Sequence, residues 1–113
     1  MAQVIINKRL EDEINRRFKG KAPEVLRHLK SLAEAPNKGK SLGHVGGIVI
    51  KEVKYEGFRF YFVTDGYKLA IYKIEELSEL LIQFVRMSDK KHQQRTIEEI
   101  KLVLRTIGPA GFK

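Results

Sequence analysis

The chain has 113 residues, which is enough for one domain, 1–113, with a single modest core. Hydrophobic residues make up 42% of it, which excludes a disordered chain. The absence of cysteine excludes disulfides, thiolate zinc sites and cysteine nucleophiles. A net charge of +8 attracts polyanions, so nucleic acid is the first expected partner and an acidic protein the second.

No apolar run approaches the roughly 20 residues needed to span a bilayer. The first ten residues also lack the apolar segment of a secretory signal. We therefore expect a cytoplasmic protein that does not contact a membrane.

The first third of the chain has helical periodicity. Apolar residues recur every four positions over 8–19 and line one stripe over 23–35, so two helices are predicted. Asn7 would cap the first helix, Gly20 would end it, and Pro36 would end the second. Because only about three residues join them, the two helices are expected to form an antiparallel hairpin.

The middle of the chain changes to strand signals. Residues 37–47 are rich in glycine and are predicted to be a loop. β-branched and aromatic residues then predict strands over 48–55, 58–63 and 69–74, joined by short turns. The alternation shifts phase near Glu52, which predicts a bulge there.

The last third is less uniform. Residues 75–87 fit either a helix or a turn followed by a strand over 80–87, and we favour the strand. A helix is predicted over 90–107, and a short strand over 4–6 precedes the first helix. The predicted fold class is α+β, with the N-terminal helix hairpin packed on an antiparallel β-meander and a C-terminal helix.

Alternation in the strand that begins at Phe58 divides its side chains between two faces. Phe58, Phe60 and Phe62 point one way and are expected to meet the helix hairpin. Arg59 and Tyr61 point the other way, to a face expected to be free. Arginine binds phosphate oxygens and tyrosine stacks on bases, so this face suits RNA. The competing interpretation is a half-exposed sheet face with long side chains lying over apolar surface.

Further basic residues are expected near this face. Lys51 and Lys54 lie on the neighbouring strand. His44 lies in the glycine loop with Lys40 close by and is expected to reach the same surface. The three histidines lack the spacing of metal ligands and no paired carboxylate motif accompanies them, so neither a metal nor another cofactor is expected.

A basic run lies at the junction between the last strand and the last helix. Arg86, Lys90, Lys91 and a protonated His92 would give it four positive groups. RNA cleavage by 2′-hydroxyl attack requires a base, an acid and cations, and histidine titrates near neutral pH. The alternative is a solvated helix start that Asp89 or the preceding serine caps.

Together these features resemble the RelE/ParE/HigB superfamily of toxins from type II toxin–antitoxin systems. The similar segments are 36–42, 50–54, 57–62 and 84–93, so the resemblance spans nearly the whole chain. It implies a compact RelE-like mRNA interferase, a metal-independent endoribonuclease that cuts ribosome-bound mRNA. In the family, lysine, arginine, tyrosine and sometimes histidine on the sheet face build the active surface.

The residue pattern and the resemblance together give the candidate site residues, with Tyr61 taken from the strand alternation alone because the family's tyrosine falls at Phe62. The candidate catalytic residues are Arg59, Tyr61, Lys90, Lys91 and His92. The candidate RNA-binding residues are Lys40, Lys51, Lys54 and Arg86. The resemblance also implies an acidic antitoxin that is partly disordered when free. This antitoxin would wrap the basic surface as an amphipathic helix or an added strand.

Two other functions remain open. A ParE-like toxin would inhibit DNA gyrase by binding it and would need no acid or base. A basic α+β domain without toxicity would bind nucleic acid or a protein partner and would have a similar composition.

Overall fold

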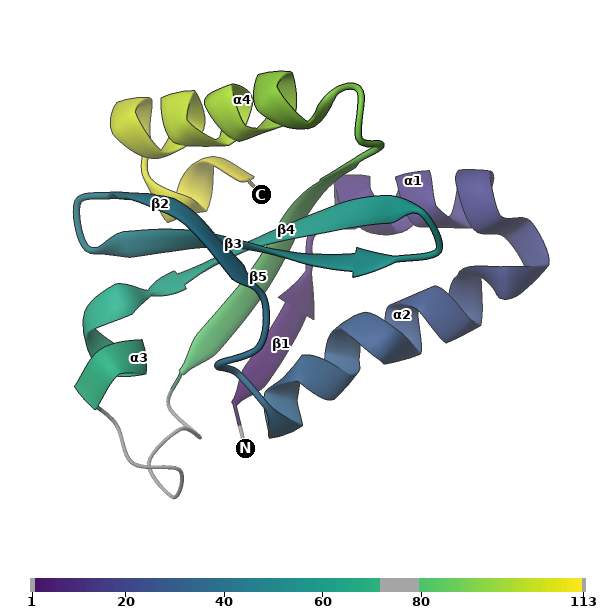
Figure 1. Ribbon diagram of the computed structural model, residues 1–113, viewed down its shortest axis with the longest axis horizontal. Helices are drawn as coiled ribbons and strands as arrows, with labels where there is room; N and C mark the ends of the chain where they lie inside the picture. The colour runs from purple at the N-terminus through teal and green to yellow at the C-terminus, as the bar shows by residue number, and fades with distance from the viewer. Residues whose placement is uncertain (1, 72–79, 113) are drawn as a thin grey trace.

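The computed structural model describes residues 2–71 and 80–112. A five-stranded sheet lies between an N-terminal pair of helices on one face and a C-terminal helix on the other (Figure 1). The predicted α+β class, with its helix pair, its meander and its C-terminal helix, is therefore confirmed. None of the described helices is long and apolar enough to cross a membrane.

The predicted helix hairpin is present. Strand β1 (Gln3–Ile6) leads into helix α1 (Lys8–Phe18). A short 3-10 turn, η1 (Lys19–Lys21), joins it to helix α2 (Ala22–Lys30), which continues as the 3-10 segment η2 (Ser31–Glu34). α2 runs back alongside α1 (Figure 1).

The caps of α1 follow simple hydrogen-bond rules. The Asn7 side chain accepts a 2.9 Å bond from the backbone N–H of Arg9, as predicted. The positive φ of 49° that ends α1 belongs to Lys19, one residue before the predicted Gly20. The N–H of Lys19 donates a hydrogen bond to the Asn15 carbonyl. This bond closes the last turn of α1 and holds Lys19 at a positive φ, which glycine adopts more readily.

Four strands form the meander. They are β2 (Lys40–Val45), β3 (Ile48–Tyr55), β4 (Phe58–Asp65) and β5 (Leu81–Ser88). The sheet order is β1-β5-β4-β3-β2, and every neighbouring pair is antiparallel except β1 and β5, which are parallel. The sheet is therefore mixed, because the N-terminal strand joins it beside the last one.

The prediction of a loop over 37–47 is wrong for Lys40–Val45, which form β2. Glycine lowers strand propensity, and Gly43 lies inside this strand. Pairing with β3 and packing of Leu42 and Val45 beneath the C-terminal helix outweigh that local preference.

The strand predicted over 69–74 is also wrong where the structure describes it, because helix α3 (Gly66–Ile71) takes its place. Asp65 explains the difference. Its Oδ1 accepts bonds from the backbone N–H groups of Tyr67 (2.9 Å) and Lys68 (3.1 Å), which is the bonding of a helix N-cap. Residues 72–79, with the predicted turn, lie outside the described residues. The strand favoured over 80–87 is confirmed as β5.

The bulge predicted at Glu52 is absent from the pairing of β3 with β4, and bulges occur on β2 and β5 instead. β3 pairs with β4 without interruption. β2 carries an extra residue, Leu42, opposite β3, and β5 carries an extra Val85 opposite β4. As a result, Val85 and Arg86 both contact elements on the face of the C-terminal helix.

The helix hairpin packs on the phenylalanine face, as predicted. Phe60, Phe62 and Phe84 are fully buried there against Leu10 and Ile14. The ring centroids of Phe62 and Phe84 lie 5.1 Å apart. Close aromatic contacts of this kind supply much of the burial in a small core.

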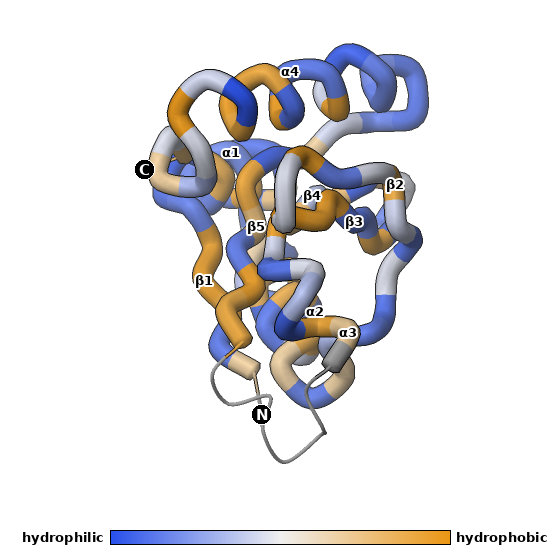
Figure 2. Tube along the Cα trace, turned by 90° about the vertical axis from the view of Figure 1, so that its left-hand side faces the viewer, coloured by the Kyte–Doolittle hydropathy of each residue, from blue (hydrophilic) through white to orange (hydrophobic). Residues whose placement is uncertain are grey.

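The opposite face is not free, contrary to the prediction. Helix α4 (Gln93–Thr106) packs Ile97, Ile100 and Leu104 onto it, and the final turn η4 (Pro109–Phe112) closes one end. Apolar and hydrophilic segments alternate along α4 (Figure 2). The apolar stripe predicted for this helix therefore packs on the sheet face that the strand pattern predicted to be free.

Candidate functional site

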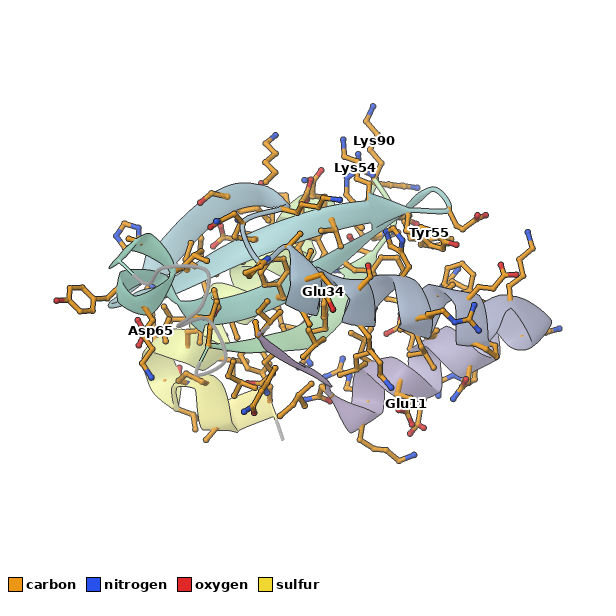
Figure 3. The ribbon with its side chains drawn as sticks, turned by 90° about the horizontal axis from the view of Figure 1, so that it is seen from below. Glu11, Glu34, Lys54, Tyr55, Asp65 and Lys90 are labelled. Carbon is orange, nitrogen blue, oxygen red and sulfur yellow. The ribbon has the colours of Figure 1, made fainter. Side chains whose placement is uncertain are left out.

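The candidate site begins with a row of side chains across three strands. Lys54 on β3 lies opposite Arg59 on β4, and Arg59 lies opposite Ser88 on β5. Directly opposed residues share one face of a sheet. Lys90 follows Ser88 by two residues, and Lys54 and Lys90 extend in the same direction (Figure 3). The structure thus brings three predicted basic residues to one end of the sheet.

Arg59 is the central group of this row. Its side chain is half-buried, and its Nε is shielded from solvent without a hydrogen-bond partner among the residues that the structure describes. Its guanidinium makes no ion pair within residues 2–71 and 80–112. A buried donor without a partner costs about 1–3 kcal/mol. An anionic oxygen would satisfy this guanidinium, which makes Arg59 the strongest candidate for ligand binding.

Tyr61 follows Arg59 by two residues on β4, on the same face of the sheet, and packs against α4. It is 0% exposed, and its Oη shares a 2.7 Å hydrogen bond with Ser88 Oγ. Burial raises the pKa of Tyr61, and the bond to Ser88 offsets that effect only in part. The exposed position predicted for Tyr61 is therefore wrong, because α4 covers this part of the face. Tyr61 remains a neutral phenol near pH 7 and holds Ser88 in place.

Glu52 is a candidate that the sequence interpretation missed. It is 2% exposed, pairs with Tyr61 across the strands, and accepts a 3.0 Å bond at Oε2 from Gln93 at the start of α4. The sequence feature that could have identified Glu52 is a carboxylate in the middle of an apolar strand. Its negative charge contributes to raising the pKa of Tyr61. Because it is enclosed, Glu52 does not reach a ligand itself, and it positions Gln93 at the start of α4, one cross-strand pair away from Arg59.

His92 is held by Asp89 at the junction of β5 and α4. Asp89 Oδ1 accepts a 2.9 Å bond from the His92 backbone N–H and lies 2.8 Å from its Nδ1. The His92 side chain is half-exposed, so Nε2 is the nitrogen left for proton transfer. The alternative in which Asp89 or Ser88 caps the helix is wrong, because His92 is the N-cap of α4 and no side chain caps it; Asp89 bonds within the turn that precedes the helix.

The charge of Asp89 gives a pH prediction. The hydrogen bond from the His92 side chain, then that from its backbone, holds the pKa of Asp89 below its usual value. A lowered carboxyl pKa stabilises the fold above about pH 4, and this stabilisation is lost as pH falls through the folded-state pKa. Asp89→Asn should therefore unfold at a lower denaturant concentration than wild type at pH 6. The difference between the two denaturant midpoints should disappear as the pH falls to about 3.

Denaturant midpoints measured from pH 3 to 7 test this expectation. Glu56→Gln is the matched control, because it removes one exposed carboxylate from the turn between β3 and β4. A gap for Asp89→Asn that stays constant with pH would show that its charge is not coupled to His92.

Lys51 does not join the site. It pairs with Phe62 on the hairpin face, is 6% exposed, and donates a 3.0 Å bond to the Asn37 carbonyl. Burial lowers the pKa of its ammonium group. Lys51 and Lys54 are separated by three positions, so alternation sends them to opposite faces. The predicted phosphate-binding floor that contained both residues is therefore wrong.

The other predicted RNA-binding residues have separate surroundings. Arg86 is largely buried, with Nε 2.8 Å from Glu99 Oε1 and Nη1 2.7 Å from the Val85 carbonyl, so it fastens β5 to α4. Lys40 is exposed on β2 and lines, with Lys54, a groove of about 430 Å³ beside α2. Lys91 is exposed beside His92.

The described residues include no group of three or more histidines and carboxylates that could hold a metal ion. No family model, no curated protein and no solved structure matches the chain. The geometry of the Arg59 row and of the Asp89–His92 pair is therefore the basis for assigning a role.

Proposed function

We propose that this chain is the toxin of a type II toxin–antitoxin system, a metal-independent endoribonuclease of the RelE/ParE/HigB type that cuts ribosome-bound mRNA in the cytoplasm. The observation that carries the proposal is the half-buried side chain of Arg59, whose Nε has no hydrogen-bond partner within residues 2–71 and 80–112 and which lies in a row with Lys54 and Ser88. The resemblance of the sequence to the superfamily supports the same conclusion.

The proposed reaction is attack of an RNA 2′-oxygen on the adjacent phosphorus. The bond from phosphorus to the 5′-oxygen breaks, which leaves a 2′,3′-cyclic phosphate and a 5′-hydroxyl end. Arg59 and Lys54 stabilise the charge on the phosphate oxygens in the transition state. His92, oriented by Asp89, donates a proton to the 5′-oxygen, and a water molecule accepts the proton of the 2′-hydroxyl.

The proposal includes an acidic antitoxin. The chain carries a net charge of +8, and Lys40, Lys54, Lys90 and Lys91 make no ion pair within the described part of the chain. An acidic segment laid over them would neutralise the Arg59 row and exclude RNA from it.

Inducible expression in a bacterial host, with growth followed and mRNA 5′ ends mapped, tests the proposed function. We expect growth arrest with new cuts in reading frame. A Lys90/Lys91/His92 triple alanine variant should lose both effects. An Arg27/Lys30 double alanine variant, which removes the same two permanent charges from the exposed surface of α2, should keep them.

Two results would contradict the proposal. Arrest without cuts would indicate a ParE-like inhibitor of gyrase. A folded protein that neither arrests growth nor cuts RNA would indicate a binding domain without toxicity.

A further inference from the structure

A polar groove lies beside the Arg59 row. It has a volume of about 250 Å³ and runs between α1 and the start of α4, where β5 ends. Arg9 and Arg17 line it from α1, Arg95 lines it from α4, and Arg86 lies on β5 between them. In Figure 1 these three elements converge at one end of the sheet.

Ion pairs occupy only part of this positive charge. Glu99 Oε1 lies 2.8 Å from Arg86 Nε and 3.7 Å from Arg9 Nη1, so one carboxylate serves two arginines. Arg17 and Arg95 make no ion pair within the described ranges. The Arg17 guanidinium lies instead 5.0 Å from the centre of the Phe58 ring.

The acidic residues of the groove do not cancel this excess. Asp89 is engaged by His92 and Glu99 by two arginines. Glu13 is the remaining carboxylate among the lining residues. The groove therefore carries a positive charge, which His92 increases when it is protonated.

The groove is continuous with the proposed active surface. Ser88 and His92 line it, and Ser88 lies opposite Arg59 in the sheet. A strand of RNA with one phosphate at Arg59 would extend directly into the groove. We propose that the groove binds a neighbouring phosphate of the same single-stranded RNA through Arg17 and Arg95.

The chemistry of the lining favours a phosphate over a protein segment. An arginine fork matches the oxygens of a phosphate and binds two of them at once. A protein segment binds mainly through apolar anchors, and the groove offers only Phe58 and Met87 among charged and polar neighbours. The RNA backbone is therefore the ligand that the groove fits. The inference rests on the proposed function for the identity of that RNA.

Salt dependence of binding tests the groove directly. The probe is a short single-stranded RNA with 2′-O-methyl groups, which binds but has no 2′-hydroxyl for attack. Each phosphate contact contributes about 0.7 to the slope of log affinity against log salt concentration. Arg95→Gln should therefore reduce the slope by about 0.7, and Arg17→Gln should do the same.

Arg105→Gln is the matched control. Arg105 is exposed on the same helix as Arg95 and does not line the groove, so its loss should leave the slope unchanged. An unchanged slope in Arg95→Gln, or an equal fall in Arg105→Gln, would overturn the inference. Circular dichroism of each variant checks the fold.

A separate assay distinguishes the groove from the nuclease. Wild-type protein is incubated with unmodified RNA and ribosomes, and cleavage is measured. If cleavage is absent but Arg95→Gln still lowers the slope, the groove binds RNA phosphate and the proposed nuclease activity is wrong.

Discussion

Arg59→Ala is expected to lower the rate of RNA cleavage by about 100- to 1,000-fold, the usual effect of losing one preorganised donor to a developing negative charge. The free energy of unfolding should change by less than about 1 kcal/mol, because Arg59 Nε bonds to no acceptor in the described part of the chain. Single-turnover cleavage of a short RNA on ribosomes gives the first quantity, and chemical denaturation gives the second. Lost activity with retained stability is the signature of a binding group.

Arg59→Lys separates charge from geometry. Lysine keeps the positive charge but not the planar fork, so it should restore only part of the activity. Lys54→Ala, in the same row, should have a smaller effect, because the charge of Lys54 is more exposed. Full activity in Arg59→Ala would contradict the role given to this residue.

Phe84→Ala is expected to destabilise the fold by about 3–5 kcal/mol, the cost of removing a buried aromatic ring and leaving a cavity. Phe84 is 0% exposed and lies between the hairpin and the ring of Phe62. The total stability of a small domain is about 5–15 kcal/mol. The variant should therefore unfold at much lower urea concentration or fail to fold at 37 °C.

Leu102→Ala provides the comparison. Leu102 is a large apolar residue on α4 that is 62% exposed, so its loss should change stability by less than about 0.5 kcal/mol. A loss below 1 kcal/mol in Phe84→Ala would mean that the core relaxes to fill the space.

The sequence predicted the fold where periodicity was long and regular. The stripes of α1, α2 and α4 and the alternation of β4 each gave the correct element. The prediction failed where a single local contact decides which element forms. Asp65 caps α3 and overrides the strand preference of the residues that follow, and β2 exists because β3 supplies its partner.

The candidate site was predicted in part. Arg59, Lys54 and His92 were identified from charge and strand alternation, and the structure places Arg59 and Lys54 in one row. Tyr61 and Lys51 lie elsewhere because burial depends on which helix covers each face, and a strand pattern does not contain that information. Glu52 was missed because its contact with Gln93 joins residues distant in sequence.

The parallel pairing of β1 with β5 has a consequence for synthesis. Gln3 lies opposite Leu81, so β1 has no neighbour in the described sheet until β5 has emerged from the ribosome. Ser88 is the last residue of β5, and His92 follows it in the chain. A nascent chain therefore cannot bring Lys54, Arg59 and Ser88 into one row before β5 has been made.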